Sequence, residues 1–422
     1  MNKPPVIGII GGTIWGNRGA ESMLVTTIGM LRHSHPDAQF VVFSYSPKKD
    51  RKLIQDRDIQ VVSAKPTSLV LRVFPFVVLA WLLRLVGIQI PGVLLTNVVR
   101  ALRRCDVLLD IGGISFVDGR EIFLPFNILT IWPAMMLKIP VVKLAQALGP
   151  FRNPVNRAAA RIFLPRCQAI FARGDITAEN LAQLKLRNVT RAADIAFLYD
   201  SRFSLSVENE EPVQELQAEL ARVKAQGRRI IMISPSSLVY EKAAKKGKDH
   251  VGELLQLVRD LDDGNTHFLF LANSTKEGSA KPRNNDIFVL DLLMQRALTT
   301  FLPEQFANMH WVNWDVNTTS LRKLMGMGDL LITSRFHAMV SGLSLCVPTL
   351  VIGWSHKYQE TLADFGMQRY AADVDHGFGD LLALARELLE QGPAVRAQLS
   401  ARLGAVRDIS RVQFQYLESL LH

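Results

Sequence analysis

Short apolar runs alternate with segments of helical periodicity along most of this chain, and that alternation limits the folds it can adopt. In the first half, the runs that predict buried strands are 6–10, 40–43, 60–62, 107–111, 141–144 and 169–172. Between them lie segments such as 20–32 and 153–163, which have a helical pattern. Strands that alternate with helices predict a parallel sheet with helices on both faces. We therefore expect an α/β protein that begins with a Rossmann-like domain.

The alternation restarts after a charged segment, which predicts a second domain. Residues 200–226 are rich in Glu and poor in apolar residues. Beyond them, the predicted strands are 229–234, 267–271, 310–314, 329–333 and 349–353, and helical segments follow at 381–389 and 395–420. We expect an N-terminal domain at 1–199, a linker helix at 200–226 and a second Rossmann-like domain at 227–422. The helical C-terminal tail either covers the second sheet or crosses back to the first domain.

Composition narrows the partners of this folded protein. Its 422 residues, 48% hydrophobic and 21% charged, can form substantial cores. The net charge of +10 favours anionic partners such as phosphorylated metabolites or acidic lipid. No long Lys/Arg tract or aromatic ladder is present, so nucleic acid is not expected. Three widely spaced cysteines without a C-x-x-C pair indicate core residues in a reducing, cytoplasmic compartment.

The most apolar window of the chain is 68–90. Its longest uncharged piece, 73–83, has eleven residues, which is shorter than the ~20 that span a bilayer. We therefore do not expect a transmembrane helix. Three interpretations stay open: a buried helix of the first domain, a contact between two copies, or a helix that lies in the lipid headgroups. The basic cluster Arg100, Arg103 and Arg104 follows closely and suits the last of these.

The stretch 334–348, SRFHAMVSGLSLCVP, places a cation and an imidazole where a predicted strand gives way to a helix. Ligands bind at such junctions in open α/β sheets. Arg335 can hold an anion and His337 can transfer a proton. From this stretch alone, a surface ion pair and a helix-start histidine explain the two residues equally well.

Polar residues follow four other predicted strands. After the first strand, the loop 11–22, GGTIWGNRGAES, is rich in glycine but lacks G-x-G-x-x-G spacing, so it does not indicate a dinucleotide. Asp110 ends a later strand, and Asp118 lies beyond it, where a solvated turn is the alternative. Arg173 precedes the predicted start of a helix, and its guanidinium and the amino end of that helix can together hold an anion. Lys357 follows the strand after His337, although a lysine at this place is commonly a surface charge.

These residues resemble the polysaccharide pyruvyl transferases. The likeness covers most of the chain and rests on the glycine loop with Asn17 and Gly19, on DVLLDIGGISFVD, on FARGD, on AADIAFLYD and on SRFHAMVSGLSLCVP. It implies two Rossmann-like domains that face each other across a cleft, as in glycosyltransferases of the B class. It also implies transfer of a pyruvyl group from phosphoenolpyruvate to a glycan or lipid-linked saccharide, which closes as a pyruvate ketal in exopolysaccharide biosynthesis.

The resemblance also implies roles for individual residues. The carboxylate and phosphate of phosphoenolpyruvate would be held by Arg173, Arg335, Lys357 and Ser334, with His337 as the acid beside them. A ligand that carries a carboxylate and a phosphate close together needs several cations in its site, and arginine and lysine supply them. On the acceptor side we expect Asn17, Glu21, Asp110 and Asp118. No cofactor or metal is expected, since phosphoenolpyruvate is the donor substrate.

One departure from the family pattern concerns the glycine loop. Where the family often has an acidic residue directly after the loop glycine, this chain has Ala20, followed by Glu21. The acceptor-side carboxylate has shifted by one position, the acceptor differs, or the chemistry of this branch is altered.

Two other functions compete with pyruvyl transfer. The first is a glycosyltransferase of similar architecture that uses a nucleotide sugar. The second is a non-catalytic, membrane-associated subunit of a glycan assembly complex. In each case we expect a cytoplasmic protein, peripheral at the inner face of the membrane if 68–90 meets lipid. Homo-oligomer formation stays open.

Overall fold

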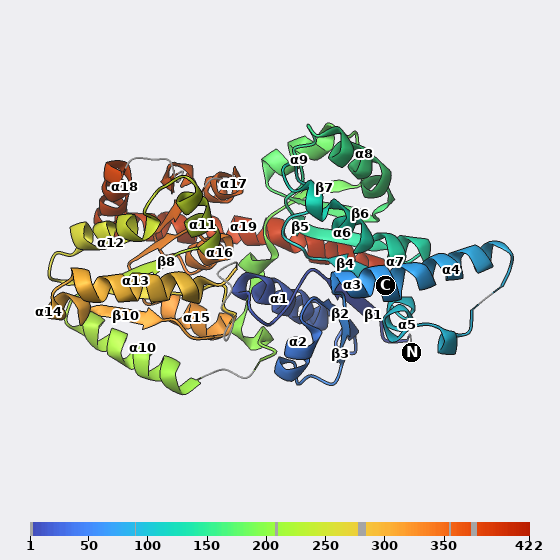
Figure 1. The fold of residues 1–422 in the computed structure, drawn as a ribbon, viewed down its shortest axis with the longest axis horizontal. Coiled ribbons are helices and arrows are strands. Elements are labelled where there is room, and N and C mark those ends of the chain that lie inside the picture. The colour runs from blue at the N-terminus through green and yellow to red at the C-terminus, as the bar shows by residue number, and fades with distance from the viewer. Residues whose placement is uncertain (1–2, 89, 207–209, 277–283, 354–355, 373–377) are drawn as a thin grey trace. The chain divides into compact units, whose positions relative to one another are not determined.

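The structure, a computed structural model, describes residues 3–88, 90–206, 210–276, 284–353, 356–372 and 378–422. The chain forms two compact units (Figure 1). Unit 1 comprises residues 1–15, 20–206 and 407–422, and unit 2 comprises residues 16–19 and 207–406. Each unit is an α/β domain with its own sheet, and the two are described separately below.

Unit 1 contains a seven-stranded sheet in the order β3-β2-β1-β4-β5-β6-β7, with all neighbours parallel. Its strands are β1 (Val6–Ile10), β2 (Gln39–Ser44), β3 (Ile59–Ser63), β4 (Val107–Asp110), β5 (Val141–Gln146), β6 (Ala169–Arg173) and β7 (Val189–Ala192). All five residues of β1 and of β6 are buried, as expected for strands covered on both faces. This strand order is that of a Rossmann sheet with one strand added.

Helices connect these strands along the chain. They are α1 (Arg18–Ser34), α2 (Pro47–Leu53), α3 (Pro66–Ser68), α4 (Phe74–Leu85), α5 (Asn97–Arg103), α6 (Leu124–Leu129), α7 (Trp132–Met136), α8 (Pro154–Phe163) and α9 (Asp175–Ala182). Side-chain caps start some of them, because the first N–H groups of a helix lack internal partners. Asn153 accepts from the N–H groups of Val155 and Asn156 at the start of α8.

Unit 2 contains a six-stranded parallel sheet in the order β10-β9-β8-β11-β12-β13. Its strands are β8 (Arg229–Ser234), β9 (Thr266–Leu271), β10 (Met309–Val312), β11 (Leu330–Thr333), β12 (Thr349–Ile352) and β13 (Ala371–Ala372). Counted within the unit, this order is 3-2-1-4-5-6, that of a classical Rossmann sheet. The chain is therefore a twin Rossmann-like α/β protein, as the alternation predicts.

The helices of unit 2 include several that begin at the carboxyl ends of its strands. They are α10 (Glu210–Ala225), α11 (Ser237–Lys245), α12 (His250–Leu261), α13 (Asp286–Thr300), α14 (Pro303–Phe306), α15 (Thr318–Met325), α16 (Phe336–Ser344), α17 (His356–Asp364) and α18 (Phe378–Glu390). The last helix, α19 (Gly392–Leu421), passes from unit 2 into unit 1. Its final part is held to unit 1 by Ser410 and Gln413, which donate to the carbonyls of Asp194 and Ala193.

The domain limits differ from the predicted ones in two respects. Helix α10, expected as a linker, belongs to unit 2, and the change between units falls at residues 206–207. Residues 407–422 belong to unit 1 rather than to the second domain, because the tail crosses back. The prediction missed β7 and β13. Strand β7 is only four residues long and mixes polar with apolar residues, and β13 has two residues.

The predicted core cysteines are free, and two of them are buried. Burial raises the pKa of the Cys105 and Cys167 thiols to about 12. A thiol of this kind stays protonated and unreactive at neutral pH.

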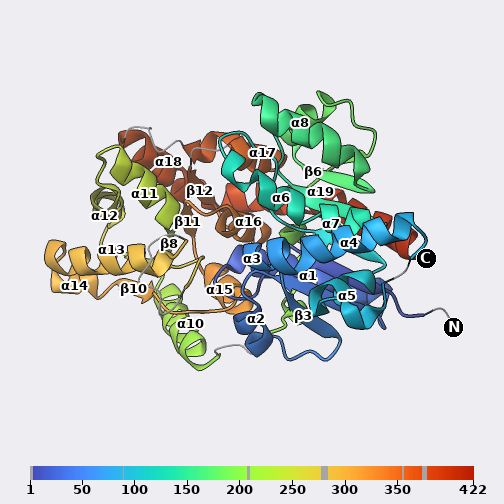
Figure 2. The ribbon, with the colours of Figure 1, turned by 45° about the vertical axis from the view of Figure 1, so that its right-hand side comes forward.

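The apolar window 68–90 forms most of a helical stretch in unit 1 that starts at Pro66 and in which the π-helical turn Leu69–Val73 separates α3 from α4. Figures 1 and 2 show α4 along the outside of unit 1. By length and composition alone, the whole stretch Pro66–Leu85 could cross a membrane, and 22% of its apolar window is buried. The interpretation of the whole segment as a buried helix is therefore wrong. Gln89 lies outside the described residues.

Candidate functional site

Two of the predicted donor-binding residues and the predicted acid His337 come from neighbouring strand ends of unit 2. Strands β11 and β12 pair in parallel, with Thr333 opposite Val351, so their carboxyl ends lie at one edge of the sheet. Arg335 is the N-cap residue of α16, directly after β11, and Lys357 lies in the first turn of α17, after β12. His337 is in the first turn of α16. All three side chains are half-buried, so each keeps access to solvent.

Arg335 is oriented by a buried acceptor set. Its guanidinium forms an ion pair with Asp286, which is fully buried, and donates to the hydroxyl of Ser237 at 3.2 Å. Asp286 also accepts from the N–H groups of Ser237 and Ser274, at 3.0 and 2.8 Å. The Nε of Arg335 is buried and has no hydrogen-bond partner among the described residues. The pair thus fixes the direction of the guanidinium and leaves a donor for a further acceptor.

His337 packs against the glycine loop. A Cβ added to Gly19 would overlap the Nδ1 and Cγ atoms of His337, so only glycine allows the ring this close to the first turn of α1. The ring also lies edge-on to Phe336, with 5.2 Å between the ring centroids. Two contacts on different elements therefore set the position of the imidazole.

Lys357 lies near the same aromatic ring. Its Nζ is 5.2 Å from the centroid of Phe336 and 5.1 Å from that of Tyr358, within the range of cation–π attraction. The Tyr358 hydroxyl donates to the carbonyl of Ser334 at 3.0 Å, and Ser334 itself is buried. Phe336 thus has His337 and Lys357 as neighbours, while Ser334 contributes through its backbone.

Residues 16–19 of the glycine loop belong to unit 2, although the loop follows the first strand of unit 1. The carbonyl of Gly16 accepts from the Ser274 hydroxyl at 3.1 Å, and the N–H of Arg18 donates to the carbonyl of Asn273 at 3.0 Å. The Arg18 side chain is buried and lies 3.5 Å from Asp315. Arg18 was not predicted as a site residue, because nothing in the loop itself points to a partner about 300 residues away.

The carboxyl ends of the unit 1 strands form a second polar region. A Cβ on Gly11 would overlap the backbone of Gly112, and Gly11 has a φ of +94°, so glycine is required where β1 and β4 end. Asp110 pairs with Lys143, whose side chain is fully buried in β5. Gln146 donates to the Asp110 carbonyl at 2.8 Å. Lys143 was missed, although a lysine inside an otherwise apolar strand signals a buried partner.

A pocket of about 180 Å³ opens beside this pair. The side chains that line it include those of Tyr45, Asp110, Ser115, Arg120 and Thr130. Burial, with a smaller contribution from the Asp110 charge, raises the pKa of Tyr45, so its phenol stays neutral. The pocket therefore offers both hydrogen-bond donors and acceptors, as a hydroxyl-rich ligand requires.

Arg173, which is also predicted to bind the donor, lies in unit 1 and is buried. It pairs with Asp194 at 2.8 Å and donates to the Gly113 carbonyl at 3.0 Å. Asp194 is fully buried and caps the following turn. The two residues come from the separate motifs FARGD and AADIAFLYD, which the fold joins.

The predicted acceptor residues have unequal surroundings. Asp118 accepts three hydrogen bonds, from the N–H groups of Arg152 and Asn153 and from the Asn156 side chain, and so holds the start of α8. Glu21 is buried in α1 and accepts from Ser206 at 3.4 Å. Asn17 is exposed and caps α1 by accepting from the N–H of Gly19 at 3.0 Å. Asp118 is thus occupied by a structural task.

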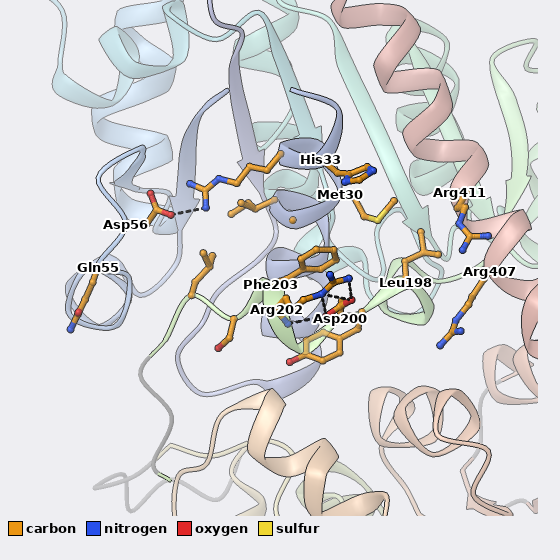
Figure 3. A pocket seen from close by; sticks show the side chains of 16 residues that line it. Met30, His33, Gln55, Asp56, Leu198, Asp200, Arg202, Phe203, Arg407 and Arg411 are labelled. Atoms are coloured by element: carbon orange, nitrogen blue, oxygen red, sulfur yellow. Dashed lines mark hydrogen bonds and ion pairs between the residues drawn. The ribbon is translucent and has the colours of Figure 1, made fainter. Parts of the chain in front are cut away.

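A larger pocket of unit 1, about 1000 Å³, is shown in Figure 3. It lies by the last turns of α1, the loop before β3 and the Asp200 segment, rather than at the carboxyl ends of the strands. Its charges are largely paired, with Arg32 on Asp56 and Arg202 on Asp200, each at 2.6 Å. Since ligands of such sheets bind at carboxyl ends, we do not assign the reaction to this pocket. Among the described residues, no group of three or more His, Cys, Asp or Glu could hold a metal ion.

Comparisons with known proteins agree with this architecture. The amylovoran biosynthesis protein AmsJ of Erwinia amylovora is 20% identical over 410 residues, covering 93% of this chain and 94% of that protein. A putative UDP-N-acetylglucosamine 2-epimerase from Listeria monocytogenes superposes with a TM-score of 0.58 at 10% identity, covering 97% of this chain and 95% of its own. The UDP-forming α,α-trehalose-phosphate synthase of Burkholderia vietnamiensis gives 0.54 at 12%, covering 99% of each chain.

The two solved structures show the fold, which is of the glycosyltransferase-B class. The family profile described as polysaccharide pyruvyl transferase matches residues 17–356, from the glycine loop to the first residue of α17. The chain therefore belongs to the polysaccharide pyruvyl transferase family and is a transferase.

Proposed function

We propose that this enzyme transfers the pyruvyl group of phosphoenolpyruvate to two hydroxyls of a glycan or lipid-linked saccharide and closes it as a ketal. The observation that carries the proposal is the grouping of Arg335, His337 and Lys357 at two adjacent strand ends of unit 2, with His337 packed on Gly19. Family membership and the resemblance to AmsJ, a protein of amylovoran biosynthesis, support a polysaccharide product.

The chemistry assigns one task to each side chain. Arg335 and Lys357 bind the carboxylate and phosphate of the donor, because a doubly anionic ligand needs fixed cations. Ser334, which directly follows β11, is a further predicted contact of the donor. Arg173 of unit 1 is the remaining one. His337 delivers a proton to the methylene carbon, since imidazole exchanges protons near neutral pH.

The atoms balance in two additions. Protonation of the methylene carbon creates an oxocarbenium-like centre at C2, and the first sugar hydroxyl bonds to it. Phosphate then leaves with its C–O bond electrons, and the second hydroxyl closes the ring. One hydroxyl proton ends on the new methyl group, and the other ends on the released phosphate. Asp110 and Glu21 are the carboxylates we propose on the acceptor side, and Asp118 is left out because its oxygens already hold α8.

Phosphate release tests the proposal directly. The purified full chain is incubated with phosphoenolpyruvate and a panel of glycans and lipid-linked saccharides, and both phosphate and the ketal methyl signal are measured. We expect equal amounts of the two with at least one acceptor. No release with any acceptor, together with no binding of phosphoenolpyruvate by calorimetry, contradicts the proposal.

The rival function makes the opposite prediction in the same assay. Two proteins of the same fold carry names that refer to UDP compounds, the epimerase and the trehalose-phosphate synthase. A nucleotide-sugar glycosyltransferase would be stabilised by UDP in a thermal-shift panel and would ignore phosphoenolpyruvate. Stabilisation by phosphoenolpyruvate and not by UDP favours pyruvyl transfer.

A further inference from the structure

We propose that the helical stretch Pro66–Leu85 and the turn that follows it dock the enzyme onto an anionic lipid bilayer, with their outer apolar face in the headgroup region. This inference concerns where the enzyme works. It does not depend on the donor that it uses.

The outer face of this helix is apolar where a soluble helix would be polar. Leu71, Pro75, Leu79, Leu82 and Val86 recur every three or four residues, which places them on one face. Leu71 and Val86 are 67% and 69% exposed, and Leu79 and Leu82 are about half exposed. Single exposed apolar side chains are ordinary, but a continuous apolar face marks an interaction surface.

The apolar surface continues beyond the helix. Gly87 ends α4 in a left-handed turn with a φ of +80°, and the N–H of Ile88 donates back to the carbonyl of Leu83 at 2.9 Å. Val93 and Leu94 follow, and they are 79% and 65% exposed. We call the exposed apolar residues of the helix and of this turn the docking surface: Val70, Leu71, Leu79, Trp81, Leu82, Leu85, Val86, Ile88, Val93 and Leu94.

The opposite face holds the helix flat on unit 1. Leu69, Val73 and Val77, one turn apart, are buried in the hydrophobic core of the unit. Phe74 adds a ring contact with Trp132, at 5.0 Å between centroids. A helix anchored on successive turns lies along a membrane surface and does not cross it.

Charge decides between a bilayer and a second copy of the chain. The 47 residues from 59 to 105 contain no Asp or Glu and six basic residues, Lys65, Arg72, Arg84, Arg100, Arg103 and Arg104. All six are exposed. A two-fold contact between copies would bring this positive region against itself, whereas anionic headgroups offer the opposite charge. Trp81, 40% exposed, is the residue type that prefers the interface between lipid and water.

The buried face of the same helix lies close to the polar pocket of unit 1. Thr130 lines that pocket and also a small apolar cavity bordered by Leu69 and Val73 of the helix. A bilayer on this side would bring lipid-linked saccharides to the unit that holds Asp110. This link to the acceptor is the part that uses the proposed function; lipid binding itself stands without it.

Vesicle flotation of the full chain tests docking. The probes are vesicles of phosphatidylcholine alone and vesicles with one third phosphatidylglycerol. We expect flotation with the anionic vesicles, loss of binding at high salt and little binding to the neutral ones. Each arginine near the surface contributes about fivefold to the affinity, so Arg72→Gln with Arg84→Gln should weaken binding by about 25-fold.

Two matched variants separate the surface from general exposure. Leu71→Glu with Leu82→Glu should reduce binding at least tenfold, because it places two carboxylates on the docking surface. Val155→Glu, at a residue 63% exposed on α8 of the same unit, should bind as the parent chain does. Equal melting temperatures show that the variants are folded. The Trp81 emission should shift to the blue on binding, and Trp81→Phe should remove that shift.

Three results overturn the inference. The first is equal binding to neutral and anionic vesicles, and the second is unchanged binding of the double Glu variant. The third is a parent chain that binds no vesicles and is dimeric by light scattering, while the double Glu variant is monomeric. The last result would assign the surface to a second copy. Loss of vesicle binding with phosphate release intact on a soluble acceptor would leave the proposed function untouched.

Discussion

The two sheets carry charged side chains at equivalent strand ends, but these side chains are buried to different extents. In unit 1, Asp110 is the last residue of β4, next to β1, and pairs with the fully buried Lys143. Arg173 pairs with the fully buried Asp194. In unit 2, Arg335 follows the strand next to β8 and pairs with Asp286, yet it stays half-buried. His337 and Lys357 beside it are also half-buried.

This difference in burial distinguishes residues that stabilise the fold from residues that can meet a ligand. A buried pair whose charges satisfy each other holds the ends of neighbouring strands in register. A half-buried cation that is oriented by a buried carboxylate keeps its direction and its access to solvent. We therefore assign the proton transfer and the two oriented cations Arg335 and Lys357 to unit 2. In unit 1, Lys143 and Asp194 stabilise the strand ends that carry Asp110 and Arg173.

The largest expected effect is on turnover in unit 2. His337→Gln keeps the size and polarity of the side chain but removes the titratable proton, so we expect kcat for phosphate release to fall by about 10²–10⁴. His33→Gln, at an exposed histidine of unit 1, is the matched control and should leave kcat unchanged. A turnover of His337→Gln within threefold of the parent would remove the distinction between the two sets of strand ends.

The next effect is on stability in unit 1. Lys143→Met leaves Asp110 buried without its partner, which should lower the free energy of unfolding by about 3–5 kcal/mol. Denaturant unfolding measures the change. Adding Asp110→Leu should recover most of the loss, because the unpaired charge is then gone. A loss below 1 kcal/mol for Lys143→Met would mean that this pair is not structural.

A smaller effect depends on pH and concerns unit 2. Burial, which outweighs the nearby charge of Asp249, lowers the pKa of His250 to about 4 from 6.5. The unfolded chain therefore takes up a proton below pH 6.5 that the folded chain refuses. The contribution of the neutral ring is complete above pH 6.5 and is lost as the pH falls to about 4, on the order of 2–3 kcal/mol. Denaturant unfolding at pH 7 and pH 4.5 should show a smaller loss in His250→Gln. An equal loss in both would contradict this assignment.

The smallest effect concerns the glycine loop. Asn17→Ala removes the cap of α1 and should cost about 1 kcal/mol of stability, measured by thermal unfolding, whereas Asn17→Ser keeps a capping oxygen. If Asn17 also binds the acceptor, Asn17→Ser should raise the KM for the acceptor while stability is retained. A Ser variant with the parent KM would restrict Asn17 to its cap.

Much of the fold could be predicted from local pattern, because each domain repeats short apolar strands and amphipathic helices. Strand β8, Arg229–Ser234, lies where it was predicted. Strand β7 was missed because polar residues interrupt its apolar pattern. The exposure of Leu71 and Leu82 could not be predicted, because an apolar run has the same composition whether it is buried in a core or faces lipid.

The candidate site could be predicted only in part. Arg335 and His337 were found because their motif joins a strand to a helix. Asp286, which orients Arg335, lies 49 residues away and belongs to no motif that names its partner. The loop 16–19 follows a unit 1 strand but bonds to unit 2. Such pairings depend on tertiary contacts that no local pattern records.

A crystal structure of the full chain with phosphoenolpyruvate tests the central assignment most directly. We expect the ligand at the carboxyl ends of β11 and β12, with its anionic oxygens within hydrogen-bond distance of Arg335 and Lys357 and its methylene carbon next to His337. Phosphoenolpyruvate bound beside Asp110 and Lys143 instead, with the unit 2 strand ends empty, would contradict it.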